Sequence, residues 1–419
     1  MVNEAAKTDA RQERGLALYR AKKPAIRHIV GGKYLVPSAG GGKDYVVDVE
    51  ERRCTCPDHE DRAVRCKHMW AISYFREEVV TPDGTTVVTE TAKVVRLTYK
   101  RDWRAYNPAQ CEEGDVVPVL LAALCAGIAE PPQAMGRPRV PLRDGIFAAA
   151  MKVYGLKSGR RSSSAIRASE RDGLIGRAPS HVTVARVIER ADLTPLLTSL
   201  VNESATPLAR AETETQYAVD STGFATTTYD RWFDYRYGTP EPRRRQRFLK
   251  CHALVGTHTH VVAAVRVTDM HGADSPEFIP LLGQAAANGV EMQEVSADKA
   301  YLSHDNLAAV EALGASPFIP LKSNSTGTGS PQMERLTNYI SLYEEEFLAH
   351  YHRRSNVETV FSMIKAKFDA SLRSKLPAAQ VNEVLLKCLC HNLSCLVLAI
   401  RELHIDPKFW APKPAQVTP

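Results

Sequence analysis

Three acidic residues stand where carboxylates could act on a phosphodiester. Asp220 ends the short β-type run 216–221, and Asp298 follows a similar run, 293–297. Glu358 lies in a helix-prone stretch further along the chain. Acids at strand ends and on a packed helix can converge even when they are distant in sequence. Three carboxylates can hold two Mg²⁺ (or Mn²⁺) ions about 3.5–4 Å apart, the arrangement used for in-line displacement at phosphorus. These residues are therefore the candidate catalytic and metal-binding triad.

The stretch around Glu358 has the pattern of an amphipathic helix. At about 100° per residue, Tyr351, Arg354, Glu358 and Lys365 share an arc of about 60°. The adjacent arc is apolar and consists of Val357, Val360, Phe361, Ile364 and Phe368. This pattern predicts a helix that docks its apolar face on a sheet and presents one acid and three polar groups at the edge. Taken alone, it also fits an ordinary helix with solvated charges.

The same four polar residues carry a resemblance to a known family. Their spacing is Tyr, two residues, Arg, three residues, Glu, six residues, Lys. It is similar to the signature of insertion-sequence transposases of the DDE type. The sequences Asp220-Ser-Thr-Gly and Ala-Asp298-Lys also resemble that family's first two acid positions. The resemblance covers about residues 100–400 and implies an RNase H-like α/β fold.

The resemblance implies a chemistry and partners. It implies metal-dependent cleavage of double-stranded DNA at transposon ends, followed by strand transfer into target DNA. It also implies a homodimer or larger assembly that synapses two ends. Arg354 and Lys365 cannot bind metal, and these two cations are expected to hold phosphates beside the site. Tyr351 is expected to contact DNA with them. A silent DNA-binding protein derived from a transposase, or a nuclease without strand transfer, are the rival functions.

A second constellation has the residue types of a zinc site. Cys54, Cys56, Cys66 and His68 lie within fifteen residues. Thiolate and imidazole are the ligands that tetrahedral Zn²⁺ prefers. The ligand order resembles the SWIM-type zinc finger, in which a β-hairpin precedes the ligands and a helix follows them. Such fingers bind DNA or protein, and the ligand pattern does not decide between them.

A basic segment suggests a polyanionic partner. Residues 137–190 contain twelve Lys and Arg against four acids, so this segment is +8 within a chain of +6. A solvated helical surface is the alternative explanation. Within it, Arg137 and Arg139 resemble the core of an AT-hook, although a plain linker fits as well. Arg186 and Arg190 share a face of a helix that Ser180 would cap, which predicts a helix-turn-helix or a plain bundle.

Both strands and helices are needed to position these groups. Short β-type runs are predicted at 216–221, 249–256, 260–267, 293–297 and 316–320, with long helices at about 334–349, 355–370 and 380–402. The chain is thus read as a SWIM-type zinc finger module at 1–80, a linker and helical DNA-binding region at 81–212, and an RNase H-like DDE catalytic domain at 213–405. The catalytic domain is expected to be a mixed sheet flanked by helices.

The sequence favours an intracellular protein, and the resemblance to insertion-sequence transposases implies the cytoplasm of a prokaryote, in association with the nucleoid. Apolar residues make up 44% of the chain and charged residues 24%, as in ordinary globular proteins. We expect no membrane partner, because no run approaches the ~20 uninterrupted apolar residues of a spanning helix. The amino terminus lacks the apolar core of a secretory signal. The nine cysteines are therefore expected to be ligands or buried thiols rather than disulfides.

Overall fold

The computed structural model describes most of the chain, in two compact units. The described residues are 2–29, 32–62, 64–80, 86–90, 102–133, 135–136, 138–211, 213–227, 248–322, 325 and 327–410. Residue contacts divide the chain into Met1–Tyr99 and Lys100–Pro419. Each unit has its own cluster of buried apolar residues. Each can therefore bury apolar surface by itself.

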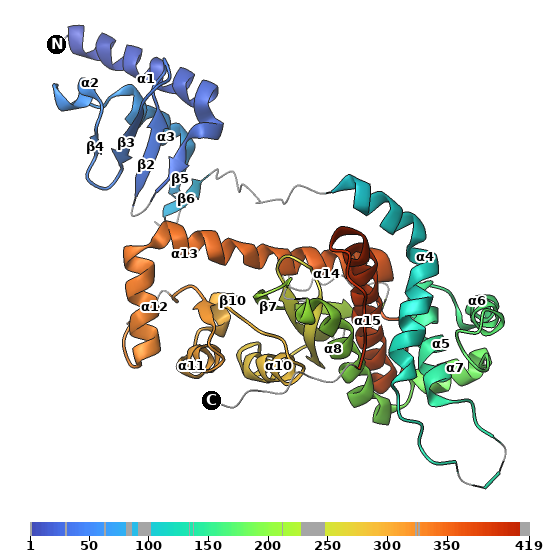
Figure 1. Cartoon of the computed structure of the whole chain (residues 1–419). Coiled ribbons are helices and arrows are strands. Elements are labelled where there is room, and N and C mark those ends of the chain that lie inside the picture. Colours follow the sequence, from blue (N-terminus) through green and yellow to red (C-terminus); the bar gives the residue numbers. More distant parts are fainter. Residues whose placement is uncertain are drawn as a thin grey trace. The chain divides into compact units, whose positions relative to one another are not determined.

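The amino-terminal unit packs helices on a small antiparallel sheet (Figure 1). Alternate residues of one strand, Tyr34 and Val36, face its core. A long helix crosses a shorter one so closely that a Cβ on Gly15 would lie 2.4 Å from the Cβ of Trp70. Its elements are α1 (Val2–Lys22), β1 (Arg27–His28), β2 (Lys33–Pro37), β3 (Asp44–Asp48), β4 (Arg53–Cys54), α2 (Pro57–Glu60), α3 (Lys67–Phe75), β5 (Arg76–Val80) and β6 (Thr86–Glu90).

The second unit contains a five-stranded mixed sheet in the order β11-β10-β7-β8-β9. β8 runs antiparallel to both of its neighbours, β7 and β9, whereas β10 is parallel to β7 and β11 is parallel to β10. This is the RNase H-like topology expected from the sequence. The strands are β7 (Gln216–Ala225), β8 (Phe248–Gly256), β9 (Val262–Asp269), β10 (Glu294–Ala297) and β11 (Ser316–Phe318).

Helices cover both faces of this sheet, which explains why every residue of β8 is buried. Lys365 of α14 reaches Thr222 on one face, while Glu277 of α10 pairs with Arg266 on the other. The helices that follow the first strands are α10 (Ser275–Ala287), α11 (His304–Ala312), α12 (Pro331–Leu342), α13 (Glu344–Tyr351), α14 (Ser355–Phe368) and α15 (Pro377–Glu402).

Two predictions about the carboxyl-terminal helices are wrong. The stretch 334–349 is two helices rather than one, because Tyr343 leaves helical geometry at φ −134° and ψ 46°. The motif from Tyr351 to Lys365 does not lie on one uninterrupted α-helix either. Tyr351 ends α13, and a 3₁₀ turn over His352–Arg354 precedes α14. Arg354 nevertheless pairs with Glu358 four residues later, at 3.2 Å. The predicted apolar face of α14 is confirmed, since its five residues are all buried.

The helices before the sheet belong to the same unit as the sheet. They are α4 (Trp103–Ala126), α5 (Leu142–Tyr154), α6 (Gly159–Arg171), α7 (His181–Ile188) and α8 (Thr194–Arg210). α4, α5 and α8 pack against α15. A buried carboxylate, Glu113 of α4, accepts hydrogen bonds from Tyr154 of α5 at 2.7 Å and from Lys367 of α14. This network ties α14, which carries Glu358, to the helical region.

The last helix, α15, is long and apolar enough to cross a membrane by length and composition. In the fold, 83% of its apolar window is buried. Asn392 on this helix bonds Val262 of β9 and Val201 of α8. These contacts identify α15 as the core helix that joins the helical region to the sheet.

The packing of α14 predicts a sharp contrast between two positions. Val360 is fully buried, whereas Met363 on the same helix is 41% exposed. Val360→Asp should destabilise the second unit by about 3 kcal/mol or more, because it buries an unpaired charge. Met363→Asp should change stability by less than about 1 kcal/mol. Thermal melting of both variants measures the difference, and equal melting temperatures would contradict the assigned face.

Candidate active site and metal centre

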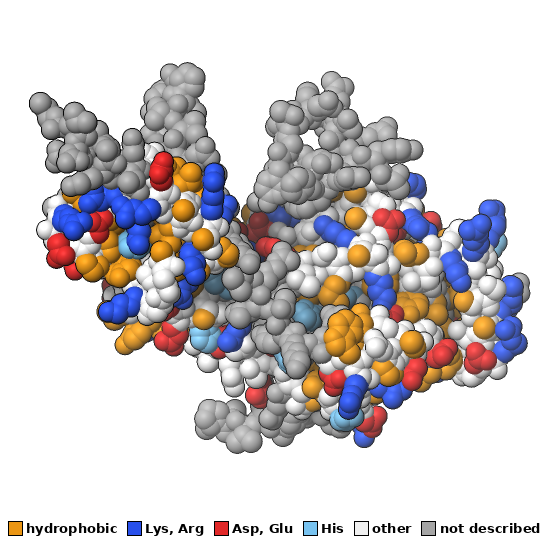
Figure 2. All heavy atoms as spheres, turned by 90° about the horizontal axis from the view of Figure 1, so that it is seen from above, with side chains coloured by type: hydrophobic (Ala, Val, Ile, Leu, Met, Phe, Trp, Pro, Cys, Tyr) orange, Lys and Arg blue, Asp and Glu red, His pale blue; other side chains and the backbone are white. Residues whose placement is uncertain are grey.

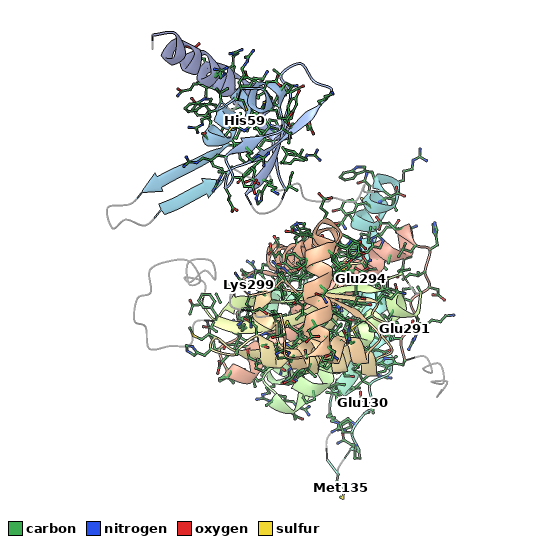
Figure 3. The ribbon with its side chains drawn as sticks, turned by 90° about the vertical axis from the view of Figure 1, so that its left-hand side faces the viewer. His59, Glu130, Met135, Glu291, Glu294 and Lys299 are labelled. Atoms are coloured by element: carbon green, nitrogen blue, oxygen red, sulfur yellow. The ribbon has the colours of Figure 1, made fainter. Side chains whose placement is uncertain are left out.

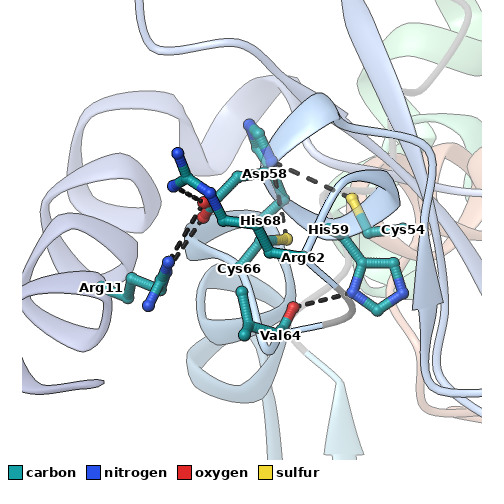
Figure 4. Close-up of polar contacts among 8 residues, drawn as sticks. All are labelled: Arg11, Cys54, Asp58, His59, Arg62, Val64, Cys66 and His68. Atoms are coloured by element: carbon teal, nitrogen blue, oxygen red, sulfur yellow. Dashed lines mark hydrogen bonds and ion pairs between the residues drawn. The ribbon is translucent and has the colours of Figure 1, made fainter. Parts of the chain in front are cut away.

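In the amino-terminal unit, four buried ligand groups converge. Cys54 ends β4, Cys56 and Cys66 precede α2 and α3, and His68 lies in the first turn of α3. Their ligand atoms all lie within 4.8 Å of one another. Nδ1 of His68 is 4.0 Å from Sγ of Cys54 and 3.8 Å from Sγ of Cys66 (Figure 4). Tetrahedral zinc requires S···N separations of about 3.6 Å, so the donor set fits this ion.

Surrounding groups hold this cluster in place. Hydrogen bonds, chiefly from Cys54 and then from His68, lower the pKa of Cys66 to about 4 despite its burial, which favours the thiolate that binds metal. Arg11 of α1 forms a two-point contact with Asp58 at 3.0 and 3.2 Å, and Arg62 donates to the same carboxylate at 3.0 Å (Figure 4). These contacts thus attach the segment between Cys56 and Cys66 to α1.

In the second unit, the first two acids of the triad lie on adjacent parallel strands. Ala297 of β10 is in register with Val219 of β7, and Asp298 and Asp220 are the next residues. The expected end of the first strand at Asp220 is wrong, because β7 continues to Ala225 and Asp220 lies within it, whereas Asp298 directly follows the end of β10. The parallel register therefore brings these acids side by side. Asp220 is also a β7 residue paired with Ala253 of β8. The sheet itself therefore sets the separation of the two strands that carry the acids.

Arg354 connects the third acid to the first. Its Nη1 lies 2.6 Å from Oδ2 of Asp220, and its Nη2 lies 3.2 Å from Oε1 of Glu358. Burial raises the pKa of Asp220, Arg354 opposes this shift, and the charges of Glu358 and Asp298 add to it. The three acids therefore share one electrostatic environment. Among the described residues, only the Cys and His cluster forms a compact metal-ligand group. The three carboxylates of the triad do not form such a group in this structure, and Arg354 contacts two of them.

The chain positions Arg354 from both sides. Glu294 at the start of β10, labelled in Figure 3, accepts from His350 at 2.8 Å, from Gln216 at 3.0 Å and from Arg353 at 3.5 Å. The centre of the Arg354 guanidinium lies 5.8 Å from the ring of Tyr351, within cation–π range. These contacts dock the end of α13 and the 3₁₀ turn on the sheet. They give Tyr351 a place beside the acids.

Lys365 lies further along the same helix, on the same face of the sheet. Its Nζ donates to Oγ1 of Thr222 at 2.6 Å and lies 5.6 Å from the ring of Phe224. Burial lowers the pKa of Lys365 to about 8. Two residues of the predicted motif therefore contact β7, Arg354 at Asp220 and Lys365 at Thr222.

A buried ionic cluster on the opposite face of β7 escaped the sequence analysis. Lys250 and His252 of β8 point at Asp274, with Nζ at 2.7 Å and Nδ1 at 3.4 Å from its Oδ1. Ser221, next to Asp220, donates to the same carboxylate, and hydrogen bonds lower the pKa of Asp274 against the effect of burial. Tyr301, three residues after Asp298, also contacts Ser221. The sequence did contain a signal for this cluster, because Lys250 and His252 are polar residues at alternate positions of an otherwise apolar strand.

The candidate DNA-contact residues of the helical region partly come together. Arg139, Arg186 and Arg190 line one groove of about 280 Å³ with Thr183. The predicted Ser180 cap is confirmed, since its Oγ accepts from the Thr183 amide at 3.2 Å. Arg190 pairs with Asp192 at 2.6 Å. Arg137 lies outside the described residues. The arm before α5 and one face of α7 thus form a common basic surface.

Comparison with known proteins gives one match that covers the acid triad. Residues 212–393 match the transposase DDE domain family. Among solved structures, a chain of the piggyBac transposase synaptic complex with hairpin DNA is 11% identical, with a TM-score of 0.31 over 71% of this chain and 74% of that one. A chain of a simian T-cell lymphotropic virus intasome in complex with PP2A regulatory subunit B56 gamma is 12% identical, with a TM-score of 0.18 over 55% and 77%. No curated protein matches the chain.

Proposed function

Residues 212–393 form a transposase DDE domain, and we propose that this protein uses it to cut DNA at transposon ends and to join the released 3′ ends to target DNA. The carrying observation is the register of β7 and β10, which aligns Asp220 with Asp298. Glu358 is joined to Asp220 through Arg354. Three carboxylates, one within a strand, one just after the neighbouring strand and one on a helix, are the donor set that this reaction requires.

Asp220, Asp298 and Glu358 would hold Mg²⁺ (or Mn²⁺), which supplies activation of the attacking oxygen and stabilisation of the leaving oxygen. Arg354 offsets the charge of Asp220 and Glu358 and keeps the two side chains close. Arg354 and Lys365 place two cations beside the acids, where each can attract a phosphate of the DNA strand. Tyr351 lies against Arg354 and would border the strand.

DNA is proposed to engage the helical region as well. The groove lined by Arg139, Arg186 and Arg190 combines an extended arm with one face of α7. A helix in the major groove with an arm in the adjacent minor groove is a known way to read duplex DNA. Arg137, which lies outside the described residues, is proposed as a further DNA contact. Because α15 and Glu113 join these helices to α14, DNA held here would have a fixed relation to the acids.

The remaining assignments complete the proposal. The amino-terminal cluster is proposed to be a SWIM-type finger that holds one Zn²⁺ through Cys54, Cys56, Cys66 and His68. Two transposon ends would be held by a homodimer or a larger synaptic assembly. The protein is proposed to act in the cytoplasm of a prokaryote, at the nucleoid.

Incubation with labelled transposon ends, Mg²⁺ and a target plasmid tests the function. The wild type should produce cut ends and joined products. Asp298→Ala should eliminate both while retaining end binding, whereas Asp305→Ala, an exposed aspartate on α11, should behave as the wild type. Cutting without joining would identify a nuclease, and binding without cutting would identify a silent DNA-binding protein. Mg²⁺-dependent cutting by Asp298→Ala would contradict the triad.

The lowered pKa of Lys365 predicts a pH dependence of DNA engagement. A lysine with a pKa of about 8 is about nine-tenths charged at pH 7 and about one-tenth charged at pH 9. Affinity for a transposon end should therefore weaken over this interval. Lys365→Arg, whose side chain stays charged, should lose less affinity than the wild type. Fluorescence anisotropy at both pH values measures the difference, and parallel losses would show that Lys365 does not contact phosphate.

A further inference from the structure

The amino-terminal unit has a groove beside the metal ligands. The proposed catalytic site does not include this groove. It has a volume of about 760 Å³, within the range of ligand sites. It is lined by Val47, Asp48, Val49, Arg52, His59, Arg65, Met69, Ile72, Ser73 and Arg76. Figure 3 labels His59 in this unit, and Figure 2 shows Lys and Arg side chains over the unit's visible face. Three arginines and one histidine thus border an apolar floor.

The single carboxylate of this groove is already engaged. Oδ1 of Asp48 accepts from the amides of Glu50 and Glu51, both at 3.0 Å. Its Oδ2 lies 3.7 Å from Nζ of Lys33. Asp48 is only 8% exposed. The charge that Asp48 brings to the groove is therefore largely offset, and the arginines determine the sign of its potential.

Two of the arginines that line this groove are exposed. Arg52 adopts a left-handed conformation, φ 53°, in the turn between β3 and β4. The guanidinium of Arg65 lies 3.8 Å from the ring centre of Trp70 and donates to Ser73. In the described part of the chain, neither Arg52 nor Arg65 has a carboxylate partner. Nδ1 of His59 donates to the carbonyl of Val64 at 2.8 Å, which fixes its ring at the groove.

We propose that this groove binds the sugar–phosphate backbone of duplex DNA, independently of sequence. Guanidinium groups match phosphate oxygens in geometry and charge, and the apolar floor can accept deoxyribose. DNA is favoured over an acidic protein because the same chain carries a transposase DDE domain, so the inference rests on the proposed function. The finger would then supply affinity while other surfaces supply specificity.

The salt dependence of binding to a random-sequence duplex tests this in the full-length protein. Each phosphate contact contributes about 0.9 to the slope of log affinity against log salt. Arg52→Ala/Arg65→Ala should reduce the slope by about two and weaken binding by ~10-fold or more. The matched control is Arg53→Ala/Lys43→Ala, which removes the same charge from the same unit. Arg53 lies next to Arg52 but lines a different groove and is 3.9 Å from Glu51.

The outcomes separate the possibilities. A reduced slope in the groove pair alone supports the proposal, and Arg52→Lys/Arg65→Lys should retain the slope because both charges remain. An unchanged slope in the groove pair, or equal losses in both pairs, would overturn it. Loss of binding to a labelled poly-glutamate peptide with an unchanged DNA slope would assign the groove to a protein partner instead. Zinc content and melting verify that each variant is folded.

This experiment fails or succeeds separately from the test of transposition. It measures binding to random DNA, whereas the function test measures products at transposon ends. If the wild type cuts and joins ends but the groove pair binds as the wild type does, only the groove assignment is wrong. If only Arg52→Ala/Arg65→Ala has a reduced salt dependence but no protein, wild type included, cuts transposon ends, the groove assignment is supported and the proposed reaction is wrong.

Discussion

Glutamine in place of Glu358 is expected to lower cleavage of transposon ends by roughly 10³-fold while the protein stays folded. The side chain of Glu358 is 54% exposed, so it contributes little to packing. Glutamine keeps its shape, and an amide oxygen can still accept the 3.2 Å hydrogen bond from Arg354. The substitution removes the negative charge that a metal ligand requires. Lost chemistry with retained structure is therefore the expected result.

The measurement pairs end cleavage with thermal melting and with Mn²⁺ binding in the absence of DNA. Glu345→Gln is the matched control, because it makes the same exchange at an exposed glutamate of α13. That control should cut and bind Mn²⁺ as the wild type does. If Glu358→Gln cuts normally and melts normally, Glu358 is not a ligand and the triad assignment fails.

Loss of two cluster cysteines should release zinc and unfold the amino-terminal unit. In Cys56→Ser/Cys66→Ser, two of four buried ligands are removed from the centre of that unit's core. Structural zinc contributes about 10–16 kcal/mol to small fingers, more than the core of so small a unit can replace. The second unit has its own core and should remain folded. One thermal transition should therefore disappear while the other persists.

Metal analysis and limited proteolysis of the full-length protein measure this effect. Wild type should contain one zinc per chain and resist cleavage within residues 1–80, whereas the double variant should lose both properties. Cys111→Ser is the control, since Cys111 is an exposed thiol on α4. Stoichiometric zinc retained in the double variant would remove the cluster as the binding site. Zinc loss with unchanged proteolysis would show that the ion does not support the fold.

Local chemistry determined much of what the sequence predicted. The starts of the strands predicted at 216–221 and 293–297 were found because short apolar runs favour strands, although β7 continues past the acid to Ala225. The apolar face of α14 was correct because side chains three and four residues apart share a side of any helix. The Cys and His ligands converge because they lie within a span of fifteen residues, from the end of β4 through α2 to the start of α3.

Contacts between distant segments escaped the sequence for a physical reason. The 3₁₀ turn before α14 places Arg354 between Asp220 and Glu358, which are 138 residues apart. A helical wheel gives the directions of side chains around one helix axis. It does not show which side chains of other elements they contact. Such pairings depend on long-range burial and charge.

Only the tertiary structure joined the helical region to the sheet. The change from helix-type to strand-type segments suggested a domain boundary near residue 212, yet the buried apolar core is continuous across it. α15 packs against α4, α5 and α8 as well as β9, and Glu113 bonds Lys367 across 254 residues. Composition and spacing determine which groups a chain offers for metal and phosphate. Whether those groups meet is decided by which apolar faces bury one another, and that choice is made by the fold as a whole.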